Sequence, residues 1–115
     1  MDASELKSGL NDLKLRLDEI REGVFDVSSK ENRLKQIEED LAKEEVWSDL
    51  ELSQKISKEK TALEKSLASF QSAEEKVSDG LMFIDIAQEE GDEASIKEII
   101  ESFYELEKLV KKKLY

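Results

Sequence analysis

The chain is 115 residues long and carries 29 acidic against 18 basic residues, which gives a formal net charge of −11. This excess of negative charge argues against binding to nucleic acid through neutralised phosphates, because that mechanism needs clustered lysine and arginine. The sequence contains no cysteine and no histidine, which excludes disulfides, thiol nucleophiles, imidazole bases and ordinary zinc sites.

Residues that break helices are almost absent, since there is no proline and there are only four glycines. We therefore predict an all-α fold, a single domain over residues 1–115, built from antiparallel helical hairpins in an elongated, coiled-coil-like bundle of about four helices, one of them very long. No apolar run approaches the roughly 20 residues that span a bilayer, and the N-terminus is polar and acidic, unlike a signal peptide. We expect a cytoplasmic chain with no membrane partner.

The first segment has apolar residues spaced alternately by four and three, which is typical of one apolar helix face. They are Leu6, Leu10, Leu13, Leu17, Ile20 and Val24. The pattern stops near Gly23. A second helix is expected to begin after Asp26 or Ser28, either of which can cap it, and Glu31 follows Ser28 at the spacing of a capping box. The apolar face of this helix consists of Leu34, Ile37 and Leu41.

The second helix is expected to end around residues 44–45, where Val46 and the only tryptophan, Trp47, interrupt the pattern. Ser48 or Asp49 can cap the next helix. The position of Trp47 is consistent with two roles.

In one reading, Trp47 seals the corner between the second and third helices, in a small cluster with Val46 and Leu50 and with Phe25 nearby. In the other, it is an exposed anchor for a partner. We predict the structural role.

The third helix shows a seven-residue repeat that continues without a strong stop until residues 89–90. Its apolar positions are Leu52, Ile56, Leu63, Leu67, Phe70, Val77, Leu81 and Ile84. Gly80 lies inside the pattern and marks either a kink or a close approach of another helix; we predict an unbroken helix. Residues 81–87 are too apolar for one narrow face, so we expect them to be covered on more than one side.

After Gly91, a predicted left-handed helix stop, Asp92 is expected to cap a last helix. Its inward residues are Ile96, Ile99, Ile100, Phe103, Leu106, Val110 and Leu114. We expect this helix to return along the second half of the third helix, while the first two helices pack near its first half.

Carboxylates are numerous, but without histidine they cannot form the Glu-x-x-His motifs of a di-metal bundle. We predict no catalytic, cofactor-binding or metal-binding residue. The acidic run at the last turn is the one group considered for partner contact, against helix capping as the structural explanation. Its members are Glu89, Glu90, Asp92 and Glu93.

The order of these features resembles the N-terminal helical domain of the bacterial release factor 2 family. The resemblance runs through the Asp/Ser-rich turn, the helix opening Lys30-Glu31-Asn32-Arg33-Leu34, and Val46-Trp47-Ser48-Asp49 ahead of the long helix. It implies that this chain is the N-terminal fragment of a longer class I translation termination factor. Proteins of that family recognise stop codons and trigger hydrolysis of peptidyl-tRNA on the ribosome.

The family's codon-reading Ser-Pro-Phe and catalytic Gly-Gly-Gln tripeptides are absent, since the chain has no proline and no adjacent glycines. We therefore expect no enzymatic activity and no cofactor. By resemblance, the domain is a helical arm that contacts the stalk-base protein of the large ribosomal subunit and the class II release factor GTPase. We expect no direct binding to DNA, and a monomer or weak dimer for the isolated fragment.

The alternative is a free-standing coiled-coil interaction or adaptor protein, whose apolar helix faces would be buried between chains. The unequal helix lengths and the broad apolar stretch at residues 81–87 argue against it, because a two-stranded coiled coil could not cover that stretch.

Overall fold

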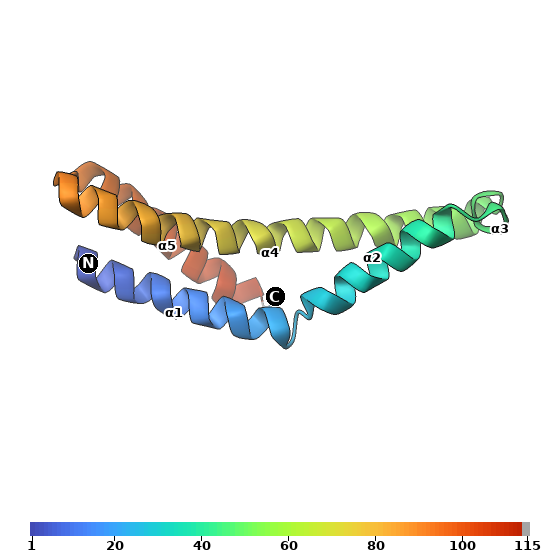
Figure 1. The fold of residues 1–115 in the computed structure, drawn as a ribbon, viewed down its shortest axis with the longest axis horizontal. Coiled ribbons are helices and arrows are strands. Elements are labelled where there is room, and N and C mark those ends of the chain that lie inside the picture. The colour runs from blue at the N-terminus through green and yellow to red at the C-terminus, as the bar shows by residue number, and fades with distance from the viewer. Residues whose placement is uncertain (114–115) are drawn as a thin grey trace. The chain divides into compact units, whose positions relative to one another are not determined.

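The computed structural model describes residues 1–113, and within them it contains helices and turns but no strand (Figure 1). The helices are α1 (Ala3–Glu22), α2 (Val27–Leu41), α3 (Glu44–Trp47), α4 (Leu50–Glu90) and α5 (Glu93–Lys113). The all-α prediction is confirmed. The helix not expected is α3, because α2 ends at Leu41, earlier than predicted, and the next residues form a separate turn of helix. Leu114, predicted to face inward, lies outside the described residues.

The helix boundaries follow from short polar side chains that cap them. Asp2 accepts a hydrogen bond from the Glu5 backbone N–H at 2.8 Å, and α1 ends before Gly23 as predicted. Asp26 caps α2 with φ +50°, a left-handed conformation that aspartate tolerates better than most residues. The capping box predicted from Ser28 is wrong, because α2 has already begun at Val27.

The described residues form two compact units, and α4 contributes to both. The three-helix unit combines Met1–Phe25 with the described residues from Gln71 onward, and the hairpin unit is Asp26–Phe70. Our prediction that both of the first two helices pack near the first half of the long helix is therefore wrong for α1. That helix packs with α5 and the second half of α4, whereas α2 lies with the first half.

The core of the three-helix unit is fully apolar. Its buried residues are Leu6, Leu10, Leu13, Leu17, Ile20, Phe25, Ala73, Val77, Ile84, Ala87, Phe103, Leu106 and Val110. The predicted face of α1 is confirmed except at Val24, which is 85% exposed because the helix has already ended. Ile96, Ile99 and Ile100 are half-buried.

Two glycines allow the helices of this unit to approach closely. A Cβ atom added to Gly80 would lie 3.2 Å from Leu10 Cδ1 and 3.8 Å from Ile99 Cγ2, so α1 and α5 both come close to α4 at that point. A Cβ added to Gly9 would lie 2.7 Å from Phe103 Cζ. The close-approach reading of Gly80 is thus confirmed, and α4 continues through it unbroken.

Ion pairs also connect α1 to α4 in this unit. Lys7 Nζ lies 2.8 Å from Asp85 Oδ1, and Arg21 Nη1 lies 2.8 Å from Glu74 Oε1. Because these pairs are largely exposed, each contributes little stability, but together they favour one register of α1 on α4.

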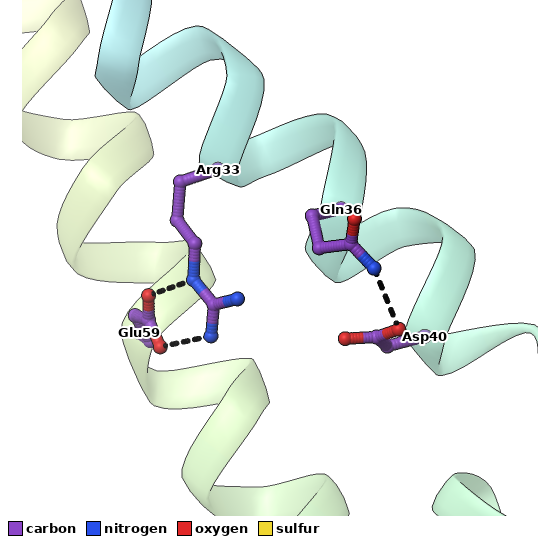
Figure 2. Close-up of polar contacts among 4 residues, drawn as sticks. All are labelled: Arg33, Gln36, Asp40 and Glu59. Carbon is purple, nitrogen blue, oxygen red and sulfur yellow. Dashed lines mark hydrogen bonds and ion pairs between the residues drawn. The ribbon is translucent and has the colours of Figure 1, made fainter.

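The hairpin unit has a smaller core. Ile37, Val46 and Ile56 are buried together, with Leu41 and Leu63 packed against them. At the surface, Arg33 on α2 donates two hydrogen bonds to Glu59 on α4, from Nε at 2.5 Å and from Nη2 at 2.8 Å (Figure 2). Because both side chains are exposed, this two-point ion pair contributes modest stability, and its geometry favours one orientation of α2 along α4.

Candidate functional site

The turn between α4 and α5 is built by Gly91, whose φ of +64° lies in the left-handed region. The Asp92 N–H donates to the Ala87 carbonyl at 2.9 Å, which closes the end of α4. The Asp92 carboxylate then accepts hydrogen bonds from the Ser95 N–H at 3.1 Å and the Ser95 hydroxyl at 2.7 Å. The predicted glycine stop and aspartate cap are both confirmed.

Of the four acidic residues considered for partner contact, the structure gives only Asp92 a local role, as the cap of α5. Glu89, Glu90 and Glu93 are exposed. Among the described residues, no ion pair or side-chain hydrogen bond involves these three glutamates. The carboxylates on both sides of Gly91 therefore remain available to a partner, and their contact with one stays a prediction.

Two capping carboxylates and one ion-paired carboxylate make stability depend on pH. Hydrogen bonds from Ser95 lower the pKa of Asp92 below its ordinary value, hydrogen bonds from Ser29 do the same for Asp26, and the Arg33 hydrogen bond lowers the pKa of Glu59. A folded-state pKa below the unfolded one means that the stabilisation is present above the ordinary carboxyl pKa of about 4 and is lost as the pH falls through the folded value.

We predict that the unchanged chain loses stability relative to Asp92→Asn as the pH falls from about 6 to about 3. Asparagine also caps helices but does not titrate, so its cap persists in acid. Thermal unfolding across this range, followed by circular dichroism, measures the difference. Glu93→Gln is the matched control, since it removes a neighbouring carboxylate that caps nothing. Parallel pH profiles for Asp92→Asn and the unchanged chain would contradict the prediction.

The apolar stretch at residues 81–87 is covered on one side only, so the prediction that it is covered on more than one side is wrong. Ile84 is fully buried, but Met82 is 54% exposed, Phe83 is 49% exposed and Ile86 is 46% exposed. The reason is geometric: α1 and α5 both pack on the face of α4 that carries Gly80, and no described element covers the opposite face. A surface of three large apolar side chains results.

The corner at α3 also differs from prediction. Val46 is buried with Ile37 and Ile56, as expected, but Trp47 is 59% exposed and Leu50 is 70% exposed. Trp47 therefore does not seal the corner. The short helix α3 directs Val46 inward, and the residue next to it points elsewhere.

Two further residues that carry the family resemblance have structural roles here. Arg33 is paired with Glu59, and Leu34 is half-buried. On the same side of α2 as Arg33, Gln36 donates a hydrogen bond to Asp40 at 3.0 Å (Figure 2).

The described residues contain no group of three or more acidic side chains placed to hold a metal ion. None of their helices is long and apolar enough to cross a membrane. The side chains described in this subsection are exposed apolar and acidic groups, and exposed apolar patches commonly mark surfaces that contact another macromolecule.

Comparisons with known proteins give one consistent name. The chain is 29% identical to peptide chain release factor 2 of Nautilia profundicola over 111 residues, which cover 96% of this chain and 30% of that protein. It is 32% identical to the release factor 2 of Burkholderia cenocepacia over 91 residues, covering 79% of this chain and 24% of that one. The match in Yersinia pseudotuberculosis is 29% identical over 83% of this chain.

No family model matches the chain, and no solved structure does. The chain spans about a quarter to a third of the length of the release factors that it matches. The aligned regions of these three relatives cover between 79% and 96% of this chain. The resemblance to peptide chain release factor 2 that the sequence predicted is therefore confirmed.

Proposed function

We propose that this chain is the N-terminal helical arm of a translation termination factor of the release factor 2 type. The observation that carries the proposal is the match to proteins named peptide chain release factor 2 over as much as 96% of the chain. The matched proteins are longer, so reading of stop codons and release of the peptide are assigned to the longer protein. The arm itself lacks the tripeptides for both tasks.

The partners that we propose for the arm are the stalk-base protein of the large ribosomal subunit and the class II release factor GTPase. A net charge of −11 supports contact with protein in preference to ribosomal RNA, because like charges repel. The free carboxylates beside Gly91 and the exposed apolar side chains of α4 supply a surface for such contact.

The burial of the α1 leucines within the single chain argues against a coiled-coil adaptor. Leu6, Leu10 and Leu17 of α1 are each at most 1% exposed within the single chain. In an adaptor that assembles through its apolar helix faces, these residues would be buried by another chain. Here α4 and α5 of the same chain bury them.

The first test is to sequence the gene beyond the codon for Tyr115. We expect the reading frame to continue past Tyr115 and to encode Ser-Pro-Phe followed by Gly-Gly-Gln. A stop codon shortly after Tyr115 would contradict the proposal and favour the free-standing interaction protein.

The second test measures binding. The 115-residue chain should sediment with purified bacterial large ribosomal subunits, and binding should drop when the stalk-base protein is removed from them. Added alone to ribosomes stalled at a stop codon, the chain should release no peptide. Equal binding to intact and depleted subunits would remove the stalk base from the proposal.

A further inference from the structure

We infer that the outward face of the second half of α4 is a docking surface for a protein whose apolar groove has basic side chains at both ends. This α4 docking face consists of Glu75, Asp79, Met82, Phe83, Ile86, Glu89 and Glu90, all of them exposed. All lie within the three-helix unit. The inference deepens the proposed function, on which it rests for the identity of the partner.

Helical spacing brings these residues onto one side of α4. Ile86 follows Met82 by four residues and Phe83 by three, and Asp79 precedes the same two by three and four, so all lie within about one third of the helix circumference. The buried residues of this half of the helix occupy the opposite side. They are Ala73, Val77, Gly80, Ile84 and Ala87. The docking face therefore points away from both α1 and α5.

The charges on this face have one sign. Between residues 77 and 93 there are six acidic residues and no lysine or arginine. Lys76 precedes this run and borders the face on the side of Phe83. Among the described residues, Lys7 and Arg21 of α1 pair with Asp85 and Glu74 of this half of α4. Both acidic residues lie on the side of α4 that faces α1. In the described structure, none of the four carboxylates of the docking face is in an ion pair.

The pattern along the face is acidic, apolar, acidic. Glu75 and Asp79 precede the apolar centre, and Glu89 and Glu90 follow it. Protein interfaces commonly have this anatomy, an apolar centre that loses its water and a charged rim that sets orientation. From Asp79 to Glu89 the helix rises about 15 Å, at about 1.5 Å per residue. The partner's basic side chains should therefore be separated by a similar distance.

The charge pattern favours a basic protein over the other classes of binding partner. A second copy of the chain would place acidic ends against acidic ends whether the two faces met parallel or antiparallel, because both ends carry negative charge. Nucleic acids and anionic membranes are repelled for the same reason. A protein groove bordered by lysine and arginine satisfies both the apolar centre and its rim.

The experiment uses the 115-residue chain and purified bacterial large ribosomal subunits, with affinity measured by sedimentation at two salt concentrations. We expect Met82→Ser with Phe83→Ser to weaken binding about tenfold or more, as loss of a central apolar anchor does. Trp47→Ser with Leu50→Ser is the matched control, because it removes two exposed apolar side chains from the hairpin unit. The melting temperature of the free chain should be nearly unchanged in both variants, since the altered side chains are exposed.

A charge reversal tests the rim. Glu89→Lys with Glu90→Lys should weaken binding and reduce its dependence on salt, whereas Glu98→Lys with Glu101→Lys, an equal change on exposed positions of α5, should have a smaller effect. Unchanged binding of the Met82 and Phe83 variant, while the unchanged chain binds, would overturn this inference and leave the proposed function intact. Absence of binding by the unchanged chain would overturn both.

Discussion

Replacing Phe103 with alanine is expected to lower the free energy of unfolding by about 3–5 kcal/mol, the usual cost of emptying a buried aromatic site. Phe103 is 3% exposed, and its ring occupies the space beside Gly9 where α1 and α5 meet. Glycine has no side chain that could move into the cavity. The loss should therefore lie toward the upper end of that range, because the site collapses poorly.

Tyr104→Ala is the matched control for this prediction. Tyr104 is the next residue along α5, its ring centroid is 5.6 Å from that of Phe103, and it is 46% exposed. Its removal should cost about 1 kcal/mol or less, mostly the aromatic contact. Urea unfolding followed by far-UV circular dichroism gives both values. Similar losses for the two variants would show that the packing of α5 against α1 is not the one described.

Replacing Ile37 with alanine is expected to cost about 2–5 kcal/mol, but in the hairpin unit. Ile37 is 0% exposed and forms the small core with Val46 and Ile56. Because so few residues make up this core, the loss of one branched side chain removes a large share of the apolar contact between α2 and α4.

Amide hydrogen exchange locates this effect. Ile37→Ala should speed exchange in Asp26–Phe70 more than in the three-helix unit, since local opening is controlled by local packing. Leu50→Ala, which shortens a 70% exposed side chain of the same unit, should change exchange little. A uniform increase along the whole chain would mean that the two units unfold together, and would contradict the prediction of a local effect.

Periodicity and capping residues predicted most of the local structure. The spacing of apolar residues in α1 identified its buried face, and the Gly91-Asp92 pair identified the end of α4 and the start of α5. These signals act within a few residues and need no knowledge of the rest of the fold. The predicted burial of Val24 was wrong because the apolar spacing was extended past Glu22, where the helix ends.

The placement of α1 and the exposure of the α4 docking face could not be predicted in the same way. An apolar face on α1 requires a partner helix but does not specify which half of α4 supplies it. The same ambiguity affected residues 81–87, whose composition suggested burial on more than one side. At Trp47, the general tendency of tryptophan toward burial gave the wrong answer, because the separate turn of α3 places only Val46 in the core.

The hairpin unit is inserted, as one continuous stretch of sequence, between the two parts of the three-helix unit, and this order matters during synthesis. The hairpin unit can close its contacts as soon as Asp26–Phe70 has been made. In contrast, α1 emerges first but must wait for Phe103 and its neighbours, about 80 residues later. At about 5–20 residues per second, that delay lasts several seconds. Until the second half of α4 has been made, the leucines of α1 lack both of the helices that bury them in the folded chain, so the nascent N-terminus exposes apolar side chains during the first part of this delay.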